Sequence, residues 1–201
     1  SYVLSMLTQN ELSQLILPVG EMTKADVRAK AALYGLRTAE KAESQEVCFI
    51  HSATGRQEFL GDRIALHRGS VVDGDGKFLG EVDAVEMVTV GQRRGLDLGG
   101  NQSRRYAVAV DVPARRVVVD SAEHLLADHV MIGAPTWVSD PLGAGERVLV
   151  QTSAHGRAFA AEFAGGSLIC DAPQRKVAAG QTVAFYDPEE PDSVLGSALA
   201  A

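Results

Sequence analysis

The sequence predicts a mainly β protein: a short N-terminal α segment, a small central β domain and a C-terminal antiparallel β-barrel. Helical periodicity is confined to the first third of the chain, before about residue 62. Beyond that point, short runs of β-branched and aromatic residues alternate with turn residues, which is typical of antiparallel sandwiches and barrels. The hydrophobic content of 46% in 201 residues is sufficient for buried cores.

Two N-capping patterns define the helices of the N-terminal segment. Thr8–Glu11 has the spacing of a capping box, and Thr23–Asp26 places an acidic residue three positions after a threonine. Apolar residues at helical spacing follow each pattern. We therefore expect helices over 8–16 and 23–34, the second ending at Gly35 as the C′ residue.

The remaining chain has the pattern of strands and turns. Ser70–Leu79 contains the turn Asp73–Gly76 between two apolar runs, which predicts a β-hairpin. A soft domain boundary lies near 124–131. We expect further strands over 47–50, 85–90, 106–111, 116–120, 147–152, 158–163, 167–171, 182–186 and 194–198.

Composition limits the possible functions. The formal net charge of −7 argues against indiscriminate binding of nucleic acid, although a local basic face remains compatible with it. The absence of an apolar run of 18 residues argues against a membrane span. Two cysteines, Cys48 and Cys170, do not form a disulfide framework and fit a cytoplasmic protein. The five histidines lack metal-ligand spacing, so no metal site is expected.

Cys48 lies where a polar run changes to an apolar one, in the stretch ESQEVCFI at 43–50. An isolated cysteine in an apolar run is most often a small buried hydrophobic residue. The alternative is a reactive thiolate at the edge of a site, with Lys41 close enough in sequence to stabilise its charge. Cys170, within Ser167–Asp171, has the pattern of a core residue in a strand.

The stretch Thr89–Leu96 is a second candidate site. Two glycines bracket Gln92, Arg93 and Arg94. The arginines could hold phosphates, and the Gln92 amide offers a donor and an acceptor. A solvated β-turn explains the same pattern equally well.

Four motifs, at 18–24, 41–50, 89–96 and 178–186, follow one another in the same order as in a known family. The chain resembles the C-terminal half to two-thirds of the bacterial tRNA-specific 2-thiouridylase family, MnmA or TrmU. The resemblance implies that 1–57 is the end of an ATP-pyrophosphatase domain, followed by a central β domain over 58–128 and a barrel over 129–201.

The resemblance also implies chemistry. The family adenylates the C2 oxygen of a wobble uridine and replaces that oxygen with sulfur, and Cys48 matches the cysteine that carries the sulfur as a persulfide. ATP, with Mg²⁺, would bind in the preceding domain, because the Ser-Gly-Gly-x-Asp-Ser type loop appears nowhere in this chain. Cys170 does not match the family's other cysteine. We therefore expect this chain alone to be inactive and to hold no cofactor.

The implied partners are the anticodon stem-loop of tRNA and a persulfide donor or relay protein, with no membrane and no DNA. Where the family tends to show an Arg-Tyr-Arg type run, this chain has Thr152–Arg157, in which Arg157 is a shifted remnant. The expected tRNA-binding residues are Ser1, Arg93, Arg94, Arg157 and Gln181.

Two other functions remain open. In the first, the chain is a non-catalytic RNA-binding module and Cys48 is structural. In the second, Cys48 is a cytosolic thiol sensor that oxidises reversibly without RNA.

Overall fold

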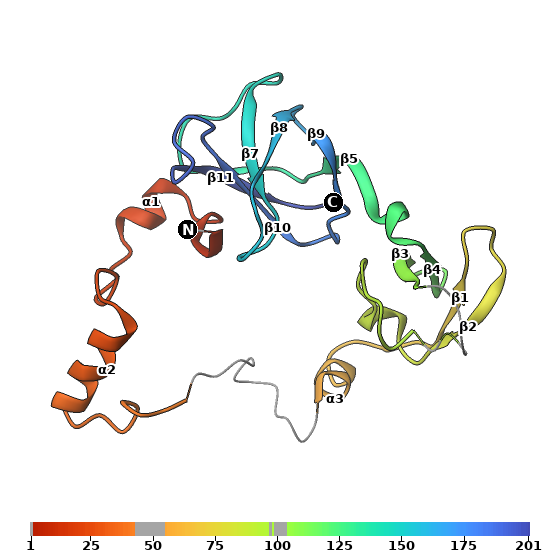
Figure 1. The fold of residues 1–201 in the computed structure, drawn as a ribbon, viewed down its shortest axis with the longest axis horizontal. Coiled ribbons are helices and arrows are strands. Elements are labelled where there is room, and N and C mark those ends of the chain that lie inside the picture. The colour runs from red at the N-terminus through yellow and green to blue at the C-terminus, as the bar shows by residue number, and fades with distance from the viewer. Residues whose placement is uncertain (1, 43–54, 97, 99–103) are drawn as a thin grey trace. The chain divides into compact units, whose positions relative to one another are not determined.

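The computed structural model describes residues 2–42, 55–96, 98 and 104–201 (Figure 1). The described chain is mostly β, with a four-stranded and a seven-stranded sheet and few helices, which confirms the prediction of a mainly β protein with a short N-terminal α segment. Contacts divide the chain into Ser1–Ser13 with Leu66–Ala201, and Gln14–Ala65. In the described part of the chain, no helix is long and apolar enough to cross a membrane. The expected strand over 47–50 lies outside the described residues.

The two predicted helices near the N-terminus begin at their capping residues, whereas η1 and α3 were not predicted. Asp26 and Thr23 complete a reciprocal capping box at the start of α2. At its end, Gly35 has φ 64° and the Leu36 N–H donates to the Ala31 carbonyl over 2.9 Å, closing a Schellman motif. The helical elements are η1 (Tyr2–Leu4), α1 (Gln9–Ser13), α2 (Lys24–Leu33) and α3 (Gly55–Gly61).

The helix predicted over 8–16 ends three residues early, at Ser13. Its start is as expected, because the Thr8 N–H donates to a Glu11 carboxylate oxygen over 2.8 Å and the Glu11 N–H donates back to the Thr8 hydroxyl. No described residue of Gln14–Ala65 is buried, so packing adds little to helix stability in this unit.

The four-stranded sheet has the strand order β2-β1-β4-β3 (Figure 1). The predicted hairpin is confirmed: β1 and β2 pair antiparallel, and the Asp73 carboxylate accepts the Lys77 N–H over 2.9 Å across the turn. β1 pairs in parallel with β4, which pairs antiparallel with β3. The strands are β1 (Gly69–Val72), β2 (Phe78–Val82), β3 (Tyr106–Asp111) and β4 (Arg116–Asp120).

The strand predicted over 85–90 is wrong, because Val85–Met87 forms the 3₁₀ helix η2. The Val85 N–H donates to the His67 carbonyl, and the Glu86 carboxylate accepts the His67 N–H over 2.9 Å. These contacts with a distant residue bend the segment. Local β propensity is therefore overridden by tertiary contacts, although Val85 still enters the sheet's core.

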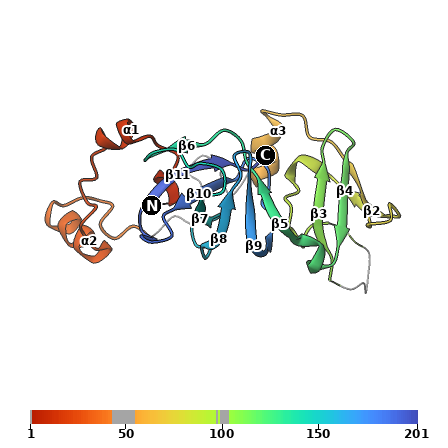
Figure 2. The same ribbon diagram turned by 90° about the horizontal axis from the view of Figure 1, so that it is seen from above.

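The seven-stranded sheet has the order β5-β9-β8-β7-β10-β11-β6 (Figure 2). All of its ladders are antiparallel. The five strands expected between 147 and 198 are confirmed, whereas β5 and the two-residue β6 were not predicted. The elements are η3 (Ala122–Leu125), β5 (Leu126–Met131), β6 (Thr136–Trp137), β7 (Arg147–Gln151), β8 (Phe159–Phe163), β9 (Ser167–Arg175), β10 (Thr182–Tyr186) and β11 (Val194–Leu199).

The prediction that this sheet closes into a barrel is wrong. β6 occupies the outer edge of β11, pairing Trp137 with Gly196 and Thr136 with Ser197. The chain beyond β5 therefore reaches only the end of β11, through an isolated bridge between Ile132 and Ala200. The seven strands form an open ladder.

The core of the seven-stranded sheet contains an aromatic cluster. The rings of Phe163 and Phe185 pack edge to face with centroids 6.1 Å apart, and Trp137 contacts both. Cys170 is 8% exposed and belongs to this core, as its sequence pattern predicts. Burial raises the pKa of its thiol, and the carboxylates of Asp128 and Asp171 raise it further, so this cysteine stays protonated.

Candidate functional site

Two of the predicted site residues lie outside the described residues: Ser1, an expected tRNA contact, and Cys48, the expected persulfide carrier. Their roles remain predictions. The structure describes the other four expected tRNA-binding residues. Arg93 and Arg94 lie beside the four-stranded sheet, and Arg157 and Gln181 lie at the seven-stranded sheet.

Gln181 lies on the surface, in the turn that leads into β10. Gly180 has φ 79°, and the Gln181 backbone pairs with Ala178 and Ala200. The side-chain amide of Gln181 donates from Nε2 to the Thr152 carbonyl over 2.8 Å. This bond joins the Gln181 turn to the loop that follows β7.

Arg157 lies in the same loop, which connects β7 to β8 over 152–158, and its side chain is exposed. The Gln151 Nε2 donates to the Gly156 carbonyl over 3.0 Å, and the Tyr186 hydroxyl donates to the Gln151 Oε1 over 2.7 Å. These bonds fix the loop on the sheet. The structure thus joins the loop that carries Arg157 to the turn that carries Gln181, although the two residues are 24 positions apart in sequence.

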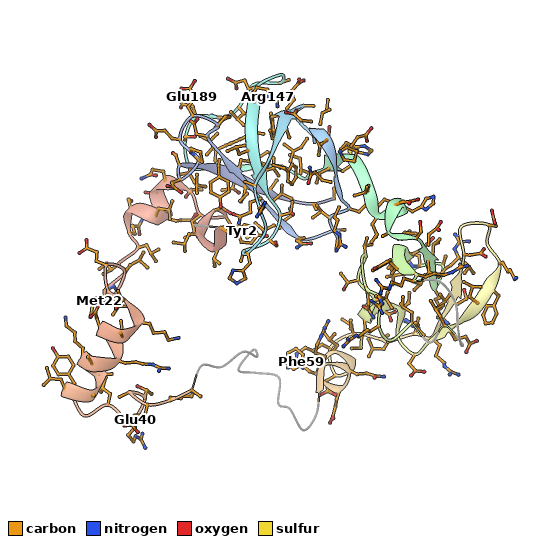
Figure 3. All side chains as sticks on the ribbon, viewed as in Figure 1. Tyr2, Met22, Glu40, Phe59, Arg147 and Glu189 are labelled. Atoms are coloured by element: carbon orange, nitrogen blue, oxygen red, sulfur yellow. The ribbon has the colours of Figure 1, made fainter. Side chains whose placement is uncertain are left out.

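Residues 2–6 dock on the seven-stranded sheet, which the sequence patterns did not predict. Tyr2 is labelled in Figure 3. Its hydroxyl donates to the Thr182 carbonyl over 2.7 Å, and Thr182 is the residue after Gln181. The buried Ser197 hydroxyl donates to the Ser5 carbonyl over 2.9 Å. Side-chain to main-chain bonds of this kind leave no periodic signal in the sequence, so only the family resemblance of Ser1 pointed to this region.

Tyr2 completes a cavity of about 260 Å³ on this surface. Burial raises the pKa of the hydroxyls of Tyr2 and Tyr186, so both are protonated donors at neutral pH. The cavity combines aromatic and alkyl groups with an amide and a carboxylate. Its lining residues are Tyr2, Gln151, Ala154, Ala158, Tyr186, Pro191 and Asp192.

The turn at 89–95 is closed by the Gln92 side chain. Its Oε1 accepts the Thr89 N–H over 3.1 Å, and its Nε2 donates to the Arg94 carbonyl over 2.9 Å. Gln92 therefore uses its donor and its acceptor within the turn, as in a structural β-turn. Arg93 and Arg94 are exposed.

Arg93 also lines a wide cavity of about 630 Å³ beside β2. Another lining residue, Arg68, faces the carboxylates of Glu81 and Asp83 at 3.9 and 3.6 Å. The charge of Arg68 is therefore partly balanced by these side chains. No group of three or more metal-ligating residues occurs in the part of the chain that the structure describes.

Comparison with known proteins identifies the family. The family model described as "tRNA methyl transferase HUP domain" matches residues 1–52, and the one described as "tRNA methyl transferase PRC-barrel domain" matches residues 57–121. Over its whole length the chain is 44% identical to the tRNA-specific 2-thiouridylase MnmA of Mycobacterium leprae. It is 40% identical to the proteins of that name from Mycolicibacterium paratuberculosis and Mycobacterium tuberculosis.

The chain belongs to the MnmA (TrmU) family. It spans 57–58% of the length of these three relatives. The domain limits expected at 57 and 128 remain a prediction.

Proposed function

We propose that this chain is part of a tRNA 2-thiouridylase and supplies the cysteine that carries sulfur and surfaces that hold tRNA. The observation that carries the proposal is the identity of 40–44% along the whole chain with proteins of that name. The bond between the Gln181 turn and the 152–158 loop, which carries Arg157, supports the proposal. An amide and a guanidinium on such a surface suit contacts with an RNA backbone.

The proposed reaction has two stages. ATP first adenylates the C2 oxygen of the wobble uridine, which turns a poor leaving group into a good one and releases pyrophosphate. The terminal sulfur of a Cys48 persulfide then attacks C2, and AMP leaves with the former C2 oxygen. The persulfide tether raises the local concentration of the nucleophile.

Release of the product requires a second thiol. After the attack, the uridine C2 is joined through two sulfurs to Cys48. A cysteine thiolate attacks the Cys48 Sγ, which breaks the S–S bond, leaves C2=S on the base and oxidises the two cysteines to a disulfide. Cys170 does not suit this step, because its thiol is buried in the core and its pKa is raised. A cellular reductant then restores the two thiols.

We further propose that tRNA is held at two places. Ser1, Arg157 and Gln181 contribute contacts at the seven-stranded sheet, and Arg93 and Arg94 contribute phosphate contacts beside the four-stranded sheet. The sulfur reaches Cys48 from a persulfide donor or relay protein. The domains proposed are 1–57, 58–128 and 129–201.

Persulfide loading tests the role of Cys48. The protein is incubated with a cysteine desulfurase and cysteine, and its intact mass is measured. We expect a gain of one sulfur atom that is lost in Cys48→Ser and retained in Cys170→Ser, the matched control. The same variants are then tested for 2-thiouridine formation in the full-length enzyme. Unchanged thiolation by Cys48→Ser would instead favour an RNA-binding module with a structural cysteine.

A further inference from the structure

Tyr2 lines an open surface cavity whose size and lining would suit one planar heterocycle. Its volume of about 260 Å³ is below the roughly 300–1,000 Å³ of pockets that enclose whole drug-sized ligands. The aromatic ring of Tyr2 and the alkyl groups of Ala154, Ala158 and Pro191 offer apolar surface to the faces of a ring. Unstacked nucleobases bind to such surfaces.

The polar groups of the cavity would suit a base better than a phosphate. The Asp192 carboxylate would repel a phosphate, whereas it can accept a hydrogen bond from the amino or imino N–H on the edge of a nucleobase. The positive charge of Arg157 comes from the adjoining loop, where it is available to the sugar-phosphate backbone that would continue from a bound base.

Hydrogen bonds hold the walls of the cavity in place. Tyr2 is held by its bond to Thr182, and the Ser197–Ser5 bond anchors the same segment. On the other wall, the bonds of Gln151 to Tyr186 and Gly156 fix the loop that carries Ala154. A preformed site loses little side-chain freedom on binding.

We propose that this cavity is a subsite for one unpaired nucleobase of the bound RNA, with the Tyr2 ring as its stacking surface. The inference rests on the proposed function, because it names the part of the tRNA that the seven-stranded sheet recognises. Recognition of an extruded base would add selectivity for a folded tRNA over a plain duplex, whose bases are paired and stacked.

Filling the cavity tests the subsite. The probe is a tRNA transcript with a wobble uridine, together with the same RNA lacking one unpaired nucleobase at a time. We expect Ala154→Trp to weaken binding of the intact tRNA roughly tenfold, in line with the usual loss of one base–aromatic stack. One abasic RNA should bind the unmodified protein equally weakly, and that RNA should lose nothing further with Ala154→Trp.

Two comparisons make the result specific. Ala144→Trp places the same side chain at an exposed alanine of another loop and should leave the affinity unchanged. Tyr2→Leu should weaken binding more than Tyr2→Phe, because leucine removes the ring whereas phenylalanine removes only the hydroxyl. Circular dichroism and the thermal midpoint verify that each variant is folded.

The outcomes separate the subsite from the proposed function. The subsite alone is overturned if Gln181→Ala weakens tRNA binding but Ala154→Trp costs the same affinity on every abasic RNA as on the intact tRNA. No binding of the tRNA by the unmodified full-length protein, together with no thiolation, overturns the proposed function and the subsite with it.

Discussion

The Tyr2 hydroxyl and the Thr182 carbonyl oxygen are hydrogen-bonded over 2.7 Å across 180 positions of sequence. This bond, together with the one between Ser197 and Ser5, makes residues 2–6 part of the seven-stranded sheet's fold. The turn that carries Gln181 and residues 2–6 therefore form one surface. The stability of that surface can be tested apart from any ligand.

Ser197→Ala is expected to lower the free energy of unfolding by roughly 1–3 kcal/mol, because it leaves the Ser5 carbonyl without this donor in a buried position. Urea unfolding followed by circular dichroism measures the loss. Ser139→Ala is the matched control, since the Ser139 hydroxyl donates to the Leu195 carbonyl in an exposed position. A loss no larger than that of the control would mean that the segment is not anchored by Ser197.

Phe185→Ala is expected to destabilise the protein by about 3–5 kcal/mol, because Phe185 is fully buried and packs against both Phe163 and Trp137. The control is Phe78→Ala, because Phe78 is 60% exposed in β2. Equal losses in thermal or urea unfolding for the two variants would contradict the assignment of the core.

The elements that could be predicted from sequence are those determined by neighbouring residues. The capping boxes at Thr8 and Thr23 and the hairpin turn at Asp73 each act within a few positions, and the structure contains all of them. Most long strands were likewise predicted from their composition. β6 was not, because two residues carry no periodic pattern.

The errors come from contacts between distant parts of the chain. Local composition favours a strand at Val85, but His67 bonds this segment into a 3₁₀ turn. The prediction of a closed barrel was wrong because β6 pairs with the outer edge of β11. Gln181 and Arg157 were named from family resemblance, yet the bond from Gln181 to Thr152 that links their surroundings depends on strand pairing.

The pair formed by His67 and Glu86 predicts a pH dependence of stability. The His67 backbone N–H and its imidazole both bond to the Glu86 carboxylate, which lowers the pKa of Glu86 from 4.5 to about 2. The ionised carboxylate is thus favoured in the folded state. Its stabilising contribution is fully present above pH 4.5 and is lost as the pH falls towards 2.

Thermal unfolding at a series of pH values tests this pair. Glu86→Gln should lower the thermal midpoint at neutral pH and flatten the decline of the midpoint between pH 4.5 and 2. Glu123→Gln, at an exposed position of η3, is the control and should follow the unmodified protein. Parallel curves for Glu86→Gln and the unmodified protein in that range would exclude the proposed linkage.

The exposed arginines of the 89–95 turn, Arg93 and Arg94, are the proposed phosphate contacts beside the four-stranded sheet. If Arg93 and Arg94 each neutralise one tRNA phosphate, their replacement by alanine should reduce the slope of log affinity against log salt by about 0.7–0.9 per arginine. Binding of tRNA measured at several salt concentrations gives the slope. Arg68→Ala is the control on the same sheet, because Arg68 already faces Glu81 and Asp83.

The two arginines are expected to act without disturbing the turn, because Gln92 closes it through bonds that involve neither arginine side chain. Gln92→Ala should therefore lower affinity by loosening the turn while leaving both positive charges in place. A salt slope that is unchanged in Arg93→Ala, Arg94→Ala and the double variant would show that this turn is solvated surface. The contacts with phosphates would then have to come from the surface around Arg157 and Gln181.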